Sequence, residues 1–185
     1  MGLRGYAPTT ADLELVVIDE VHDPNAPQFP GLFEDNRVPV FPNAYQRYRW
    51  DWDCGCPSGT YSPWDTTVLG MAVKPGEIIQ APNSGYDIGG GYEYMVLYAD
   101  DTRLTLHVGN EDDLSGYVIH LEDVCVEPDL LALYRSLNAA GRDELPVLRG
   151  EQPLGRAIGN EIKIAVRDSG HFLDPRSRND WWQGR

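Results

Sequence analysis

Proline and glycine interrupt this chain so often that few segments are long enough to form a helix. The 185 residues include 19 glycines and 14 prolines, and both are scattered along the sequence. Proline ends helices and central strands, and glycine favours turns, so this pattern is typical of short strands joined by turns. The sequence therefore predicts a small, mainly β protein with antiparallel strands and disfavours a helical bundle.

One segment, residues 128–140, has the pattern of a helix. Pro128 suits the first turn, and Gly141 follows the last apolar residue. Helical spacing places one apolar face on Leu130, Leu131, Leu133, Tyr134 and Leu137. We expect this helix to be an insertion between strands.

The first 60 residues differ in character from the rest. Residues 13–21 form an apolar run rich in valine and isoleucine, which predicts a strand. Residues 22–43 contain five prolines and predict an extended arm that packs on a β domain formed by residues 61–185. The expected anchors of the arm are Phe29, Leu32, Phe33, Val38, Val40 and Phe41.

Later segments alternate between apolar runs and turn residues. Two short strands are expected on either side of Pro75-Gly76, and residues 92–108 predict a hairpin that turns at Asp100-Asp101. Residues 116–126, 146–158 and 160–166 add further strands.

The net charge of -14 and the pI near 4.5 restrict the partners of this chain. An acidic surface repels phosphate backbones and anionic lipids, so we expect no nucleic-acid partner. No run of about 20 apolar residues is present, so no membrane span is expected. The first residues lack the apolar stretch of a signal peptide, which favours a cytoplasmic location; export would need a signal segment ahead of residue 1.

Three cysteines occur, at positions 54, 56 and 125. Cys54 and Cys56 are close in sequence, which disfavours a disulfide between them, and free thiols are the leading expectation. A disulfide from one of them to Cys125, or a metal site at the Cys-x-Cys pair, are the alternatives.

Six aromatic residues fall within residues 44–64. A buried aromatic layer is one interpretation of this cluster. A surface that stacks on carbohydrate or peptide is the other, and its contacts would be Tyr48, Trp50, Trp52 and Trp64.

Four segments in order resemble the lysostaphin-type (LytM-like) zinc endopeptidases, which cut peptidoglycan cross-bridges. They are "GMAVKPGEIIQAPNSG", "VIHLEDV", "VLRGEQPLGRAIG" and "EIKIAVRDSGHFLDP", within residues 61–182. The resemblance implies an antiparallel β domain with a groove floored by strands.

The metal-binding residues of that family are not retained. Its H-x-x-x-D segment corresponds to Tyr61 and Asp65, and its H-x-H segment to Glu161 and Lys163. Only Asp65, as a ligand, and His120, as a catalytic residue, keep the expected type. A catalytic zinc needs three protein ligands, so we expect no metal or other cofactor in this groove.

The resemblance and the lost ligands together give three hypotheses. The leading one is a catalytically degenerate protein that binds a cell-wall peptide, a glycan or a protein partner such as an amidase. The second is a metal-independent enzyme in which His120 acts as acid or base, with Tyr61, Asp65, Glu161 and Lys163 around it. The third retains zinc hydrolysis through other ligands; His22, His107 and His171 are the remaining histidines.

Overall fold

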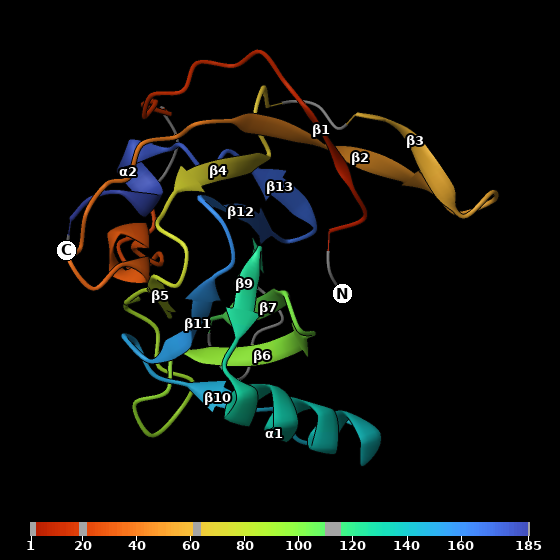
Figure 1. Cartoon of the computed structure of the whole chain (residues 1–185), viewed down its shortest axis with the longest axis vertical. Helices are drawn as coiled ribbons and strands as arrows, with labels where there is room; N and C mark the ends of the chain where they lie inside the picture. The colour runs from red at the N-terminus through yellow and green to blue at the C-terminus, as the bar shows by residue number, and fades with distance from the viewer. Residues whose placement is uncertain (1–2, 19–21, 61–63, 110–115, 185) are drawn as a thin grey trace.

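The computed structural model describes residues 3–18, 22–60, 64–109 and 116–184. The chain is mainly β, as the sequence predicts, with 39% strand and 12% helix (Figure 1). In the first half the elements are β1 (Tyr6–Pro8), the 3-10 helix η1 (Phe29–Leu32), β2 (Ala44–Asp51), β3 (Cys56–Thr60), β4 (Val68–Ala72), β5 (Ile78–Gln80) and β6 (Tyr94–Ala99). In the second half they are β7 (Arg103–Val108), β8 (Tyr117–Glu122), β9 (Val124–Val126), α1 (Pro128–Ala139), β10 (Val147–Leu148), β11 (Pro153–Ala157), β12 (Glu161–Asp168), β13 (His171–Leu173) and α2 (Arg178–Trp181).

The strands form one large and one small antiparallel sheet. The large sheet has the order β1-β2-β4-β12-β8-β7-β6-β10, with β13 paired to β12 and β3 paired to β2. The small sheet has the order β5-β11-β9. Beyond the rest of the large sheet, β2 and β3 extend as a hairpin, at the right of Figure 1. Strand β12 lies near the middle of the large sheet, between β4 and β8.

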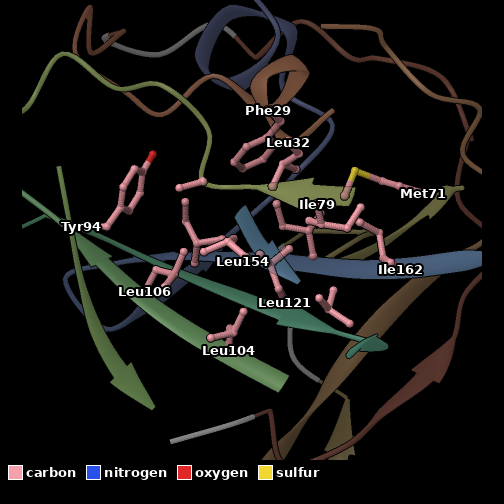
Figure 2. Close-up of a cluster of buried hydrophobic side chains, with 14 of the residues drawn as sticks. Phe29, Leu32, Met71, Ile79, Tyr94, Leu104, Leu106, Leu121, Leu154 and Ile162 are labelled. Carbon is pink, nitrogen blue, oxygen red and sulfur yellow. The ribbon is translucent and has the colours of Figure 1, made fainter. Parts of the chain in front are cut away.

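The main core lies between the two sheets and η1. Figure 2 shows Ile79 of β5 and Leu154 of β11 facing Leu121 and Ile162 of the large sheet. Because side chains on a strand alternate between faces, the inward residues of β12 are Ile162, Ile164 and Val166, all buried. The intervening residues of β12 therefore lie on the outer face of the sheet.

The proline-rich arm is part of this core. Phe29 is fully buried and stacks on Trp181 near the C-terminus, with ring centroids 5.5 Å apart. Leu32 and Phe33 are buried beside it, as expected for anchors. The expectation for Val38 and Val40 is wrong, because they are 50% and 75% exposed. In this part of the arm only Phe41 reaches the core.

One expectation from the first half of the sequence needs correction. Within the described residues, Leu13–Ile18 make a single bridge, between Val16 and Ser177, and no strand; residues 19–21 lie outside the described part. The strand that the N-terminal segment supplies is β1 instead, which pairs with β2. The two strands around Pro75-Gly76 form as β4 and β5, but they join different sheets and do not pair with each other.

Helix α1 and the β6–β7 hairpin are confirmed. The helix begins at Pro128 and packs on β6, where the rings of Tyr134 and Tyr98 lie 6.2 Å apart. Leu130, Leu131 and Tyr134 are buried, whereas Leu133 is exposed, so the buried face is narrower than expected. The hairpin turns at Asp100-Asp101, where the Asp100 N–H donates to the Arg103 carbonyl at 3.0 Å.

Candidate functional site

The outer face of β12 carries the polar residues that the sequence singled out. Glu161 lies opposite Ala72 of β4, and Lys163 lies between Gly70 of β4 and Glu122 of β8. The period of two along β12 places Glu161 and Lys163 on the same face. The structure therefore brings these two predicted residues together, with Lys163 Nζ 3.4 Å from Glu161 Oε1.

The Glu161 carboxylate is surrounded by donors. It accepts a hydrogen bond from the Tyr45 hydroxyl at 2.7 Å and another from the Asn43 amide. Beneath it lies Gly70, where an added Cβ would come within 2.7 Å of the carboxyl carbon. The missing side chain at Gly70 is what leaves room for this carboxylate.

Lys163 forms its closest ion pair with Asp123, which joins β8 to β9. Asp123 has a φ of 66°, a left-handed conformation that aspartate adopts more readily than most residues. On the same face, the Tyr6 hydroxyl donates to Glu122 at 3.0 Å. Below, "the outer-face cluster" means Tyr6, Asn43, Tyr45, Glu122, Asp123, Glu161 and Lys163.

Burial and neighbouring charges shift the pKa of several groups in the outer-face cluster. Burial acts to lower the pKa of Lys163, but the carboxylates of Asp123 and Glu161 outweigh it and raise that pKa. Burial, together with the Glu161 carboxylate, raises the pKa of Tyr45 well above its usual value. Lys163 is therefore an ammonium and Tyr45 a neutral phenol at neutral pH, and burial raises the pKa of Glu122, which accepts from Tyr6.

His120 lies on the same face of β8, opposite Thr105 of β7 and Ala165 of β12. Its side chain is buried, with 4% exposed, and its ring stacks on Phe172 with centroids 5.8 Å apart. Nδ1 lies 3.2 Å from the Thr105 hydroxyl oxygen, and Nε2 has no hydrogen-bond partner among the described residues. Burial, with the nearby positive charge of Arg167 and Arg47, lowers the pKa of His120 to about 3. The imidazole is therefore neutral and enclosed.

The other two predicted groove residues lie elsewhere or are not described. Asp65 precedes β4, and its charge contributes to raising the pKa of Arg176, near the C-terminus. Glu161 pairs with the opposite end of β4, at Ala72. Tyr61 lies outside the described residues.

The four predicted aromatic contacts do not share one environment. Trp50 and Trp52 belong to the β2–β3 hairpin, and the Arg4 guanidinium lies 4.9 Å and 4.2 Å from their ring centroids. Trp52 is 76% exposed. Tyr48 lies against the N-terminal segment, where a Cβ at Gly5 would touch its ring. Trp64 lines a separate small cavity.

The end of the hairpin corrects the expectation for the cysteines. Cys54 and Cys56 form a disulfide, with Cα atoms 5.3 Å apart, and Cys125 is a free, exposed thiol. Gly55 has a φ of 63°, so the chain turns sharply between the two cysteines. That turn brings the Cα atoms into the range that a disulfide spans, which sequence separation alone did not indicate.

A wide groove lies outside the outer-face cluster. It has a volume of about 830 Å³ and is lined by Glu34, Asp35, Arg37–Val40 and Ala72–Ile78. Its walls include the exposed Val38 and Val40 and the ion pair between Arg37 and Glu77. His120, Glu161 and Lys163 do not line it.

Sequence reasoning missed most members of the outer-face cluster. Tyr6, Asn43 and Tyr45 come from the N-terminal 60 residues, and nothing in their local sequence connects them to β12. Glu122 and Asp123 lie within the segment "VIHLEDV" that contains His120, and this closeness in sequence was the one available signal. The pairing of β2 with β4 is what brings Tyr45 to Glu161.

Comparison with protein-family models, with curated proteins and with solved structures found no match to this chain. Among the described residues, no three His, Cys, Asp or Glu side chains are grouped so that they could hold a metal ion. In that part of the chain, no helix is both long and apolar enough to cross a membrane.

The position of Glu161 over Gly70 can be tested by a double-mutant cycle. We expect Gly70→Ala to lower the free energy of unfolding by about 1–3 kcal/mol, because the new methyl group displaces a carboxylate held by three partners. In a Glu161→Ala background the same change should cost at least about 1 kcal/mol less. Urea denaturation of the four proteins measures this coupling.

Gly159→Ala is the matched control, since a Cβ there meets no heavy atom within 4 Å. We expect the control to change stability by less than about 0.5 kcal/mol. Equal costs of Gly70→Ala in the two backgrounds would contradict the placement of Glu161.

The burial of His120 predicts a pH dependence of stability. Its pKa is about 3 in the folded protein and near 6.5 when unfolded, so the unfolded chain binds more protons as pH falls below 6.5. Stability from this group is complete above that pH and is lost on acidification. Between pH 7 and pH 5 the loss is about 2 kcal/mol. Urea denaturation at both pH values measures the free energy of unfolding. In His120→Gln its decrease from pH 7 to pH 5 should be smaller than in the unaltered chain by this amount. An identical loss in both proteins would show that His120 is not buried in the neutral form.

Proposed function

We propose that this chain acts by binding and not by catalysis, and that its ligand is a cell-wall glycan or peptide. The observation that carries the first part is the outer-face cluster. Glu161 accepts from Tyr45 and Asn43 and lies beside Lys163, which is paired with Asp123. These contacts hold Glu161 and Lys163 in fixed positions, and a cation stands where a zinc ligand would be needed, which disfavours both a metal ion and a free general base at this place.

The strand register supports the loss of a metal site in a second way. Gly70 is the β4 residue that lies opposite Lys163. The H-x-x-x-D motif of the LytM-like enzymes can be placed with its aspartate at Gly70. Its histidine then corresponds to Thr66. One hydroxyl group and one absent side chain do not replace a histidine and an aspartate as zinc ligands.

The second part of the proposal rests on the β2–β3 hairpin. Trp52 is the most exposed tryptophan in the described residues, and Arg4 stacks beside it and Trp50. Exposing an indole to water is unfavourable, and a hairpin that projects from a sheet presents it to other molecules (Figure 1). Flat, partly apolar faces of sugar rings stack on such indoles, and the Arg4 guanidinium adds a charge for carboxylates of the ligand.

A protein partner such as a cell-wall amidase is the alternative ligand that the LytM-like resemblance implies. It would use the same exposed hairpin. The two ligands differ in a simple respect, because a glycan or peptide ligand requires no second protein for binding to purified cell wall.

The test is co-sedimentation of the purified protein with insoluble peptidoglycan. We expect binding of the unaltered chain, and a loss of at least about tenfold in affinity in Trp52→Ala, since stacked aromatics dominate such contacts. Val40→Ala is the control, because Val40 is equally exposed and lies at a different surface. The soluble fraction is assayed for released amines and reducing ends.

Each outcome of this test has a definite meaning. Binding that depends on Trp52, without released fragments, supports the proposal. Binding that appears only when an amidase is added favours the protein partner. Release of fragments by the protein alone, at a rate that His120→Gln abolishes, would contradict the proposal and favour metal-independent catalysis.

A further inference from the structure

A small cavity lies beside α2, away from both the hairpin and the outer-face cluster. It has a volume of about 120 Å³. The ends of β12 and β13, the start of β8 and the C-terminal segment surround it. Its walls are formed by Ile18, Trp64, Tyr117, Asp168, Leu173, Asp174, Ser177, Asp180 and Trp181. This set contains three aromatic rings and three carboxylates, and no lysine, arginine or histidine.

The aromatic walls are held rigidly. Trp181 is buried, its indole N–H donates to the Asp174 carbonyl at 3.0 Å, and its ring stacks on Phe29. Tyr117 meets the same indole edge-on, with ring centroids 5.1 Å apart and planes at 88°. Because packing and hydrogen bonds already fix these two rings, they need no further ordering when a ligand binds.

The carboxylates differ in how far they are neutralised. Asp174 forms a buried, two-pronged ion pair with Arg176. The Asp180 carboxylate lies 3.3 Å from His22 Nδ1 and accepts from the Ser177 hydroxyl, and no lysine or arginine of the described residues pairs with it. Among the ion pairs of the described residues, none joins Asp168 to a cation, and the Ser169 hydroxyl is its one hydrogen-bond donor from a side chain. Negative charge at this cavity therefore exceeds positive charge.

A further carboxylate near the cavity, that of Asp23, adds to this negative charge. The Tyr86 hydroxyl donates to Asp23 at 2.7 Å, and the charge of Asp23 acts on Tyr117 as well. The phenol of Tyr117 thus points its polar end toward a carboxylate and presents the rest of its ring to the cavity. Aromatic faces and carboxylates both attract cations. Each of these attractions is stronger in an enclosed site than in water.

The walls distinguish between kinds of cation. A bare metal ion needs several converging oxygen ligands, and no such group is present among the described residues. Ile18, Leu173 and the indoles instead provide apolar surface for carbon atoms. A volume of about 120 Å³ corresponds to roughly four water molecules, which suits an ammonium group with a few methyl or methylene carbons.

We propose that this cavity is a binding site for an alkylammonium group, such as the end of a lysine side chain or a small free amine. Trp64, Tyr117 and Trp181 surround the carbons next to the nitrogen, and Asp168 and Asp180 balance its charge. The site does not depend on the proposed function, because it shares no residue with the hairpin surface of Arg4, Trp50 and Trp52.

The test is titration of the full chain with n-butylammonium chloride, followed by tryptophan fluorescence and by two-dimensional NMR. We expect saturable binding in the millimolar range, consistent with a ligand of about five heavy atoms. Shifted NMR signals should include the indole N–H groups of Trp64 and Trp181. The uncharged probe n-pentanol is one carbon longer and more apolar, and it should nevertheless bind at least about tenfold more weakly.

Two variants and a control separate the site from non-specific charge effects. Asp168→Asn and Asp180→Asn should each weaken butylammonium binding at least about fivefold at low salt. Asp143→Asn removes the same charge from an exposed position beyond α1 and should leave affinity within about twofold. Thermal unfolding confirms that each variant is folded. If Asp168→Asn does not fold, Asp180→Asn provides the test.

Three results would overturn the proposal. They are an absence of saturable binding, equal affinities for butylammonium and pentanol, and unchanged affinity in both aspartate variants. Failure of cell-wall binding through Trp52 leaves these outcomes unaffected, so the two proposals fail separately.

Discussion

The ion pairs of Lys163 connect parts of the chain that are far apart in sequence. Lys163 extends from the middle of the large sheet to Asp123 at the β8–β9 junction, and to Glu161 on its own strand. Glu161 in turn holds Tyr45 and Asn43 of the N-terminal 60 residues against β12. The Lys163 and Glu161 side chains are only 16% and 18% exposed, so removing either one would leave the other charge partly buried without its neighbour. The outer face of the sheet therefore depends on Lys163.

The same arrangement explains why the protein has more than one candidate surface. A LytM-like enzyme would place its chemistry on this face, but here the polar groups of the outer-face cluster bind one another. The surfaces that we propose for recognition lie elsewhere, at Trp52 on the hairpin and at the carboxylates Asp168 and Asp180 beside α2. Because the chain carries a net charge of -14, a cationic ligand is drawn to it from every direction.

Local signals in the sequence predicted local structure well. Pro128 and Gly141 bracket α1 closely, and alternation predicted the strands that contain Ile162 and Ile164. Contacts between residues far apart in sequence could not be predicted from such local signals. Nothing near Leu13 indicates that the N-terminal strand begins at Tyr6, and the turn at Gly55 that joins Cys54 to Cys56 depends on backbone angles. Asp65 was expected beside Glu161, whereas strand register puts Gly70 opposite Lys163.

The most direct test of the account is the zinc content of the purified protein after growth with zinc and without chelators. A network in which the Lys163 ammonium and the Tyr45 hydroxyl both contact Glu161 Oε1 predicts far less than one zinc per chain. The protein should also keep its unfolding temperature when zinc is added. About one zinc per chain, removed by Glu161→Gln, would contradict the account, because the outer-face cluster would then be a metal centre.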